Sequence, residues 1–219
     1  MILPNKFTRI ILVLFRRMCY NCFAEKDCGR IAVISMLQKI RDKDDIFIER
    51  VAKLHTPFLN HLMRFLTFLG DQGKIWFVVL AIIIYSKRSV YVAVSFFGSV
   101  IFAFVSSEVI IKRIVARVRP CHKIDEENLV LKKIPKFYSF PSSHSATSFA
   151  MVTLSFVHCS MWTTIAILIL AIGISFSRFY LQAHYLTDVV CGIIIGVTFS
   201  YAMSRVILAI FTAYYPSLI

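Results

Sequence analysis

The chain has 219 residues, of which 58% are hydrophobic, and its mean hydropathy of +0.73 is too high for an ordinary soluble domain of this size. Its apolar residues are concentrated in blocks, which predicts a single integral membrane domain. The formal net charge is +13. Beside apolar blocks, such a charge indicates anionic lipid headgroups or phosphorylated substrates as partners, and the lack of a base-reading motif excludes nucleic acid.

Residues 1–53 form a basic N-terminal segment with eleven Lys or Arg residues and no apolar run of 18 residues. The alternation of basic and apolar residues predicts amphipathic helices on the membrane surface, and a solvated basic tail fits equally well. A sixth span within residues 7–35 is a further alternative, but it would bury several charges at high cost. Cys19 and Cys22 have the spacing of metal ligands, although no second pair completes a zinc site.

Residues 54–219 form the predicted membrane domain, an all-α polytopic bundle of about five membrane spans. A span needs about 20 mostly apolar residues. Residues 54–70 are apolar but carry His55, Asn60, His61 and Arg64, so they indicate an interfacial helix instead. The third and fourth spans share one apolar block, which is too long for a single span and breaks at His158–Ser160. The predicted spans are Leu69–Ser86, Ser89–Ile111, two within Ala146–Phe176, and Val189–Ala213.

Five spans divide the polar segments between two membrane faces. Residues 1–70, 112–140 and 178–188 fall on one face, whereas the Lys87–Arg88 turn, the His158 turn and the C-terminus fall on the other. The first face therefore gathers three segments that are rich in phosphate-binding and proton-transfer groups.

The first of these segments is KRIVARVRP, from Lys112 to Pro120. Lys112 and Arg119 are seven residues apart, which would project them from one side of a helix that Pro120 ends. Glu108 precedes Lys112 by one turn and is placed to pair with it. Ordinary positive flanking of a span is the alternative interpretation.

The second segment is PSSH, from Pro141 to His144. Pro141 is suited to start a helix that Ser142 or Ser143 would cap, and the free N–H groups of a helix N-terminus bind anions. His144 would then lie in the first turn beside a bound anion. Simple capping is the alternative.

The third segment is SRFYLQAHYLTD, which contains Arg178, His184 and Asp188. Four residues separate His184 from Asp188, so they would be neighbours on one helical face. A carboxylate bound to one ring nitrogen leaves the other free to attack, and a guanidinium suits phosphate oxygens. Charged groups at a membrane edge are costly and are usually functional.

Together, these residues supply what phosphoryl transfer needs: positive charge, an in-line nucleophile and an acid for the leaving oxygen. The sequence lacks the carboxylate cluster of a Mg²⁺ site, which favours a metal-free route through histidine. In order and spacing, the three segments resemble the motifs K-x6-R-P, P-S-G-H and S-R-x5-H-x3-D of the type 2 phosphatidic acid phosphatase superfamily of membrane lipid phosphatases. The resemblance covers roughly residues 54–219. Ser143 stands where that family has glycine, which would cost stability if φ there were positive.

The resemblance implies a role for each matching residue. His184 would attack phosphorus and become a phosphohistidine, Asp188 would orient it, and His144 would act as general acid and base. No metal or other cofactor is implied. The phosphate would be held by Lys112, Arg119, Ser142, Ser143 and Arg178.

The substrate expected first is a polyprenyl diphosphate such as undecaprenyl diphosphate. Phosphatidylglycerophosphate, phosphatidic acid and lipid A phosphates remain open, as do a lipid-to-lipid phosphotransferase and an inactive lipid-binding protein. We expect a bacterial plasma membrane location. The resemblance favours an extracytoplasmic active site, whereas the excess of Lys and Arg on the catalytic face favours the opposite orientation. The sequence leaves the oligomeric state open.

Overall fold

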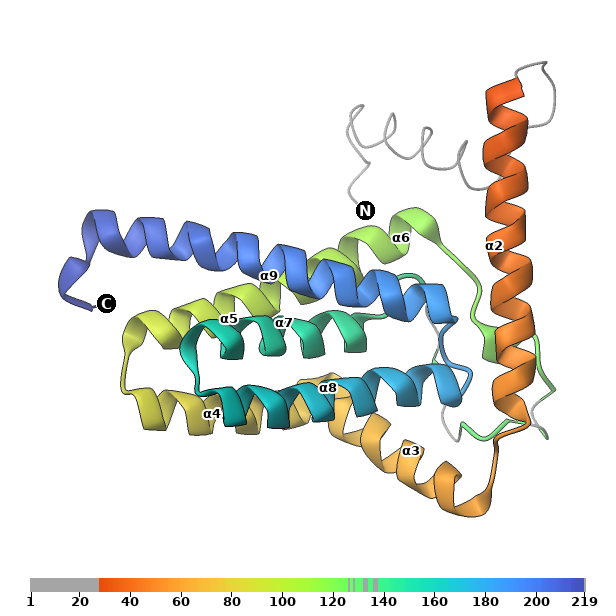
Figure 1. Cartoon of the computed structure of the whole chain (residues 1–219), viewed down its shortest axis with the longest axis horizontal. Helices are drawn as coiled ribbons and strands as arrows, with labels where there is room; N and C mark the ends of the chain where they lie inside the picture. The colour runs from red at the N-terminus through yellow and green to blue at the C-terminus, as the bar shows by residue number, and fades with distance from the viewer. Residues whose placement is uncertain (1–27, 126, 128, 132–133, 136–137, 219) are drawn as a thin grey trace, which may run out of the picture.

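A computed structural model describes residues 28–125, 127, 129–131, 134–135 and 138–218, and these residues form helices and loops without a strand (Figure 1). The all-α prediction is thereby confirmed. A π-helical stretch, Val105–Ile111, joins α5 to α6 without a break. The α-helices are α2 (Cys28–Ala52), α3 (Pro57–Gly70), α4 (Lys74–Lys87), α5 (Val90–Phe104), α6 (Lys112–Val115), α7 (Ser143–His158), α8 (Met161–Tyr180) and α9 (Leu186–Tyr214).

Four helical stretches are long and apolar enough to cross a membrane. Helix α7 adds a fifth helical segment to these four in the bundle. It has 16 residues, runs between α8 and α9, and packs on both. Large apolar side chains such as Phe77, Trp162 and Ile169 remain exposed on the outside of the bundle, as expected where lipid replaces water. The stretches that qualify are Pro57–Lys87, Val90–Val115, Met161–Tyr180 and Leu186–Tyr214.

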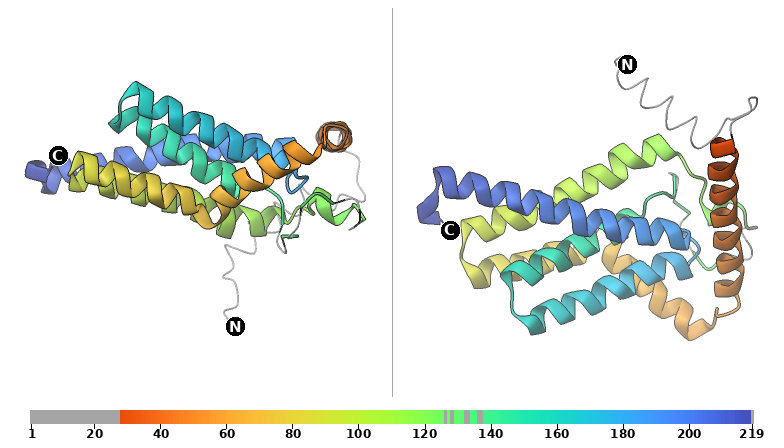
Figure 2. Two further views of the ribbon diagram at one scale, coloured as in Figure 1. Left: turned by 90° about the horizontal axis from the view of Figure 1, so that it is seen from below. Right: turned by 45° about the horizontal axis from the view of Figure 1, so that its top comes forward.

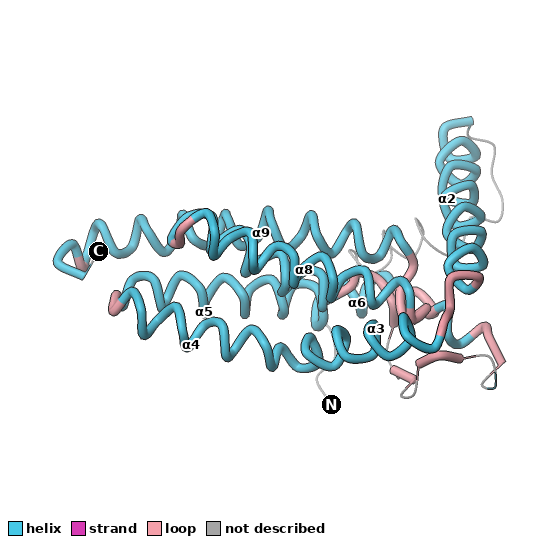
Figure 3. Tube along the Cα trace, turned by 60° about the horizontal axis from the view of Figure 1, so that its bottom comes forward, coloured by secondary structure: helices cyan, strands magenta, loops and turns pink. Residues whose placement is uncertain are grey.

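The two ends of the bundle differ in what they carry. The α4–α5 turn, the α7–α8 turn and the C-terminus lie at one end, and most loops gather at the other, beside α2 (Figures 1 and 3). The predicted turn at His158–Ser160 is confirmed, since α7 ends at His158 and Ser160 caps α8. All three motif-bearing segments therefore meet at the α2 end.

Helix α2 runs across this end of the bundle instead of along it, and it is seen end-on in the left view of Figure 2. Ile48 and Val51 are buried on its inner face and join a core cluster that includes Met63, Cys121 and Tyr180. The predicted boundary between the N-terminal segment and the membrane domain, at residues 53 and 54, falls just after α2 ends. Core residues from both sides of this boundary nevertheless pack together. Residues 1–27, with Cys19, Cys22 and most of the alternative span within residues 7–35, lie outside the described residues.

A corner separates α3 from α4. Gln72 and Gly73 have φ values of 56° and 72°, and these two left-handed residues interrupt the helix. Residues 54–70, expected to lie in the interface, thus form a separate helix that turns away from the bundle in Figure 1, although α3 and α4 together are apolar enough to count as one stretch. The corner places Asp71 beside the first turn of α7.

Helices α7 and α9 touch through their backbones. A Cβ atom on Gly196 would lie 2.3 Å from the carbonyl oxygen of Ala146, and one on Gly192 would lie 2.4 Å from that of Ser142. Such G-x-x-x-G contacts let membrane helices approach closely. The contact fixes the start of α7 against the start of α9, where two of the three motifs lie.

Candidate active site

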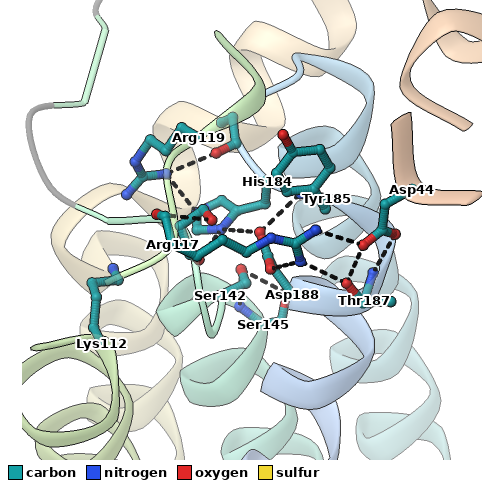
Figure 4. A network of polar contacts seen from close by, with 12 residues as sticks. Asp44, Lys112, Arg117, Arg119, Ser142, Ser145, His184, Tyr185, Thr187 and Asp188 are labelled. Atoms are coloured by element: carbon teal, nitrogen blue, oxygen red, sulfur yellow. Dashed lines mark hydrogen bonds and ion pairs between the residues drawn. The ribbon is translucent and has the colours of Figure 1, made fainter. Parts of the chain in front are cut away.

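The three motif-bearing segments meet in a buried cluster at the α2 end of the bundle (Figure 4). Seven of the eight predicted site residues are between 0 and 8% exposed, and the eighth, His144, has a side chain that is 17% exposed. The seven are Lys112, Arg119, Ser142, Ser143, Arg178, His184 and Asp188.

The first motif reaches the cluster by a different route from the one predicted. Helix α6 ends at Val115, and Ala116 adopts a left-handed conformation with φ 51°. Arg119 is extended, and Pro120 begins a 3₁₀ turn instead of ending a helix. The prediction that Lys112 and Arg119 project from one side of a helix is therefore wrong. The left-handed Ala116 changes the direction of the chain. Lys112 therefore reaches the site from α6, and Arg119 reaches it from the extended segment that follows.

Backbone hydrogen bonds join the loops that carry the motifs. The Cys121 N–H donates to the Gln182 carbonyl at 3.0 Å, and the Ser139 N–H donates to the Arg117 carbonyl at 2.8 Å. Arg119 Nη1 donates to the Ala183 carbonyl at 2.8 Å. These bonds hold the first motif and the segment before the second one against the loop that carries His184.

His184 is held at both ring nitrogens. It precedes α9, so the prediction that it shares a helical face with Asp188 is wrong. Its Nδ1 lies 2.7 Å from the Ser139 carbonyl oxygen and 3.8 Å from Asp188 Oδ2. Since a carbonyl only accepts, Nδ1 carries the proton and the lone pair is on Nε2, which lies 2.9 Å from Arg119 Nη1.

The charge state of His184 follows from its surroundings. Burial lowers the pKa of His184 well below its ordinary value, and the positive charges of Arg119 and Arg178 lower it further. The imidazole is thus neutral at pH 7, which is the state that a nitrogen nucleophile requires.

Two further cations converge on the same space. The predicted pairing of Lys112 with Glu108 is confirmed. Arg178 Nη1 donates to Thr67 Oγ1 at 2.5 Å, whereas its Nε has no hydrogen-bond partner among the described residues. A buried charged donor costs several kcal/mol unless it is paired, so this nitrogen is placed for an anionic ligand.

The second motif supplies a helix N-terminus. Ser142 is the N-cap of α7, and its hydroxyl accepts a hydrogen bond from Ser145 N–H at 3.4 Å. The Ser142 N–H in turn donates to the Asp188 carbonyl at 3.0 Å. Ser143 opens the helix and is not among the residues with positive φ, so the backbone needs no glycine there.

His144 lies in the first turn of α7, between the cations and an apolar cavity. Its Nε2 lies 3.1 Å from Asp71 Oδ1, in the corner between α3 and α4. The cavity, of about 320 Å³, opens on Ser143 and His144 and continues between α4 and α5. Its apolar walls include Trp76, Phe77, Leu80, Phe97, Val100, Ile101, Phe104 and Met151.

Comparison with known proteins decides the family, because residues 89–211 match the PAP2 superfamily. The chain belongs to the PAP2 superfamily. It is therefore a membrane phosphatase by family, which confirms the enzyme class expected from the three motifs.

Two relatives match large parts of this PAP2 chain. An undecaprenyl-diphosphatase of Sulfolobus acidocaldarius is 33% identical over 139 residues, which make up 63% of this chain and 66% of that protein. A lipid A 4'-phosphatase of Bacteroides thetaiotaomicron is 28% identical over 176 residues, or 74% of this chain and 75% of that protein.

Two crystal structures share the PAP2 fold at 18% identity. Aquifex aeolicus LpxE has a TM-score of 0.60 and matches over 72% of this chain and 92% of its own. A transmembrane PAP2-type phosphatidylglycerolphosphate phosphatase of Bacillus subtilis has a TM-score of 0.58, over 91% and 92%. The second match extends beyond the family region of residues 89–211 and supports the helical architecture of most of the chain.

Several residues of this PAP2 site were missed by the sequence reasoning. Ser139 contributes a backbone carbonyl, which no side-chain motif reveals. Thr67 lies in the helix that was predicted to be interfacial, and Asp71 lies in a corner that falls within the first predicted span. Arg117 lies inside the first motif but at a position that the motif leaves free, and it contacts Asp44 and Asp188.

No group of three or more His, Cys, Asp or Glu side chains in the described part of the chain is arranged to hold a metal ion. His122, which the sequence places in the loop after the first motif, is exposed and bonds to the Pro135 carbonyl at 3.0 Å.

Proposed function

We propose that this protein hydrolyses a lipid phosphate or diphosphate through a phosphohistidine formed on His184. The observation that carries the proposal is the place of His144, between a cluster of buried cations and an apolar cavity. In such a substrate, the oxygen that must be protonated joins the phosphorus under attack to the lipid part. The acid therefore has to stand at the boundary where His144 lies.

In the first step, His184 Nε2 attacks the terminal phosphorus. An N–P bond forms while the bond from phosphorus to the bridging oxygen breaks, and His144 donates its proton to that oxygen. Substrate must first displace Arg119 from Nε2, because Arg119 Nη1 occupies the lone pair at 2.9 Å. Arg119 then turns to the phosphate oxygens, together with Lys112 and Arg178.

In the second step, water hydrolyses the phosphohistidine. His144, now unprotonated, takes a proton from the water as its oxygen bonds to phosphorus. The N–P bond breaks, inorganic phosphate leaves, and His184 is restored. Ser139 keeps the ring oriented through its carbonyl, so Asp188 would act through its charge and its hold on the loop. No step here requires a metal ion.

The first-choice substrate is a polyprenyl diphosphate such as undecaprenyl diphosphate. One relative, 33% identical, carries the name undecaprenyl-diphosphatase. The cavity of about 320 Å³ beside His144 lies at the small end of the range for ligand pockets, and its aromatic walls suit one unsaturated chain better than the several acyl chains of lipid A. Phosphatidylglycerophosphate and phosphatidic acid are the next candidates.

Phosphate release from a panel of lipids tests the proposal. Purified protein would be given undecaprenyl diphosphate, phosphatidylglycerophosphate, phosphatidic acid and lipid A, with and without EDTA. We expect the fastest release from the polyprenyl diphosphate, unchanged activity in EDTA and inhibition by vanadate. His184→Ala should lower the rate of phosphate release by more than about 10³-fold. The matched control is His122→Ala, in the exposed loop, which should keep full activity.

Three outcomes would contradict parts of the proposal. Release that persists in His184→Ala would reject the phosphohistidine, and loss of activity in EDTA would reject the metal-free route. If labelled phosphate moved to a second lipid instead of to water, the enzyme would be a phosphotransferase.

We propose further that the catalytic end faces the extracytoplasmic side of a plasma membrane. Lys112, Arg119 and Arg178 are buried at that end and belong to the site, so they do not act as the solvated loop charges that govern topology. Labelling of single cysteines with a membrane-impermeant maleimide in intact cells tests this. Cys121 is buried and unsuitable. In an active cysteine-free background, Asp125→Cys should react and Arg88→Cys, at the opposite end, should not; the reverse result would reject the orientation.

A further inference from the structure

Helix α2 precedes the region that matches the PAP2 family, yet one of its side chains enters the active site. Asp44 lies on the buried face of α2 with Ile48 and Val51, and it is 1% exposed. A carboxylate buried in this way needs partners to offset its desolvation. Those partners come from the first and third catalytic motifs.

Asp44 and Asp188 share one guanidinium (Figure 4). Arg117 Nη2 lies 2.8 Å from Asp44 Oδ2, and Arg117 Nη1 lies 2.7 Å from Asp188 Oδ1. Thr187 closes the cluster. Its hydroxyl bonds to Asp44 and accepts from Arg117 at 2.8 Å, and its backbone N–H donates to Asp44 at 3.2 Å.

This sharing removes Arg117 from the set of phosphate-binding cations. Both of its terminal nitrogens are occupied by the cluster, and its guanidinium lies 3.8 Å from the Tyr185 ring centroid. Burial by itself would lower the pKa of Arg117, but the charges of Asp188 and Asp44 raise it above its ordinary value. Arg117 therefore stays charged and fixed between two carboxylates.

The position of Asp188 depends on this arrangement. With Oδ1 on Arg117, its Oδ2 accepts from the Tyr185 N–H at 2.9 Å and stays 3.8 Å from His184 Nδ1. A guanidinium that faces only one carboxylate prefers two parallel bonds to it. Without Asp44, Arg117 would take both oxygens of Asp188 and draw Oδ2 away from the loop that holds His184.

We propose that Asp44 is a positioning residue of the active site, through which α2 holds Arg117, Asp188 and the His184 loop in register. The inference rests on the proposed phosphatase function. It makes α2 a required part of the catalytic unit and not only a surface helix, because Asp44 bonds to Arg117 and Thr187, which lie 73 and 143 residues later in the chain.

A pair of adjacent substitutions tests the proposal. Asp44→Asn keeps the size of the side chain but removes its charge, and we expect kcat to fall about 10- to 100-fold, as for other groups that orient a catalytic ligand. KM and inhibition by vanadate should change little, because the phosphate-binding cations remain. The matched control is Asp45→Asn. Asp45 is half exposed and pairs across the surface with Lys123 at 3.3 Å, so its loss should leave kcat unchanged.

Two further measurements separate positioning from folding. Asp44→Glu restores the charge and should recover part of kcat. In an Arg117→Lys background, Asp44→Asn should cost less than it does in the wild type, because both changes act through one path. Activity is scaled to the folded fraction measured by size-exclusion chromatography and thermal unfolding.

The outcomes are distinguishable from failure of the proposed function. If the wild type releases phosphate and Asp44→Asn matches Asp45→Asn per folded molecule, this inference is rejected and the phosphatase assignment stands. A change confined to KM would also reject it. If the wild type releases no phosphate from any lipid, the proposed function itself fails.

Discussion

The two histidines of the site occupy contrasting environments. His184 is 1% exposed, and both of its ring nitrogens are bound, one by a backbone carbonyl and one by Arg119. His144 is more exposed and faces the apolar cavity, and its ring has one hydrogen-bond partner among the described residues, Asp71, whose side chain is 47% exposed. Within this part of the chain, the main chain of a neighbouring loop fixes the first ring, and a contact across a helix corner holds the second.

This difference matches the two roles that we propose for them. A nucleophile must wait in one orientation with its lone pair free of a proton, and a fixed buried ring meets that need. A group that first gives and then takes a proton must meet a leaving oxygen and later a water molecule. A ring at the edge of a cavity, held by one contact, is suited to both. The contrast predicts that substitutions at the two histidines will fail at different steps.

Among changes that leave the proposed nucleophile in place, replacing His144 should have the largest effect. His144→Ala should lower turnover of a lipid substrate about 10²- to 10⁴-fold, the usual contribution of a general acid and base. A water-soluble nitrophenyl phosphate, whose leaving group needs no proton, should still give a rapid burst of about one nitrophenol per enzyme molecule. The burst reflects phosphohistidine that forms but is not hydrolysed, and rapid-mixing absorbance measures it.

The same experiment on His184→Ala provides the contrast. This variant should give no burst with the nitrophenyl ester, since the attacking nitrogen is gone. Equal bursts from both variants, or from neither, would show that the two rings do not divide the work as proposed.

A smaller effect is expected for the free energy of unfolding when the pH is lowered. The pKa of His184 is lowered in the folded protein, so the unfolded chain binds a proton at residue 184 before the native one does. As the pH falls below about 6.5, this proton favours unfolding by up to tenfold per pH unit, until the lowered pKa is reached. Thermal unfolding in detergent should show that loss in the wild type. His184→Gln should show less of it, and parallel curves would contradict the neutral, buried state of His184.

Removing the partner of His144 should have the smallest effect. Because Asp71 is half exposed, Asp71→Asn should slow turnover of a lipid substrate only about 1.5- to fivefold. The nitrophenyl ester burst should be unaffected, since that step needs no acid. Asp125→Asn, in the exposed loop, is the control. A loss as large as that of His144→Ala would place Asp71 in the chemistry itself.

Features set by local sequence were predicted well. Hydropathy indicated the helices, the polar residues from His158 to Ser160 indicated the turn between α7 and α8, and helical spacing indicated the pair of Glu108 and Lys112. The candidate site residues, by contrast, came from the joint spacing of three motifs over residues 112–188. The hydropathy, the turn and the Glu108–Lys112 pair are each a signal within one turn or one helix.

The contacts that position the site were less accessible. A left-handed Ala116 has no residue preference that would reveal it, and a backbone carbonyl such as that of Ser139 leaves no mark in the sequence. Asp44 meets Arg117 across 73 residues of chain, beyond any periodic pattern. The close contact of Gly192 and Gly196 with another helix could have been predicted from the sequence, because G-x-x-x-G within an apolar run is a known packing motif.

That contact has a consequence for how such enzymes diversify. Where two helices meet main chain to main chain, their separation does not depend on which side chains surround them. The walls of the apolar cavity beside His144 come largely from α4 and α5, and these two helices are not part of the α7–α9 contact. Mutations that reshape the walls for another lipid therefore leave the spacing of the reactive groups untouched, and a single phosphate-cleaving geometry is free to serve proteins named for quite different lipids.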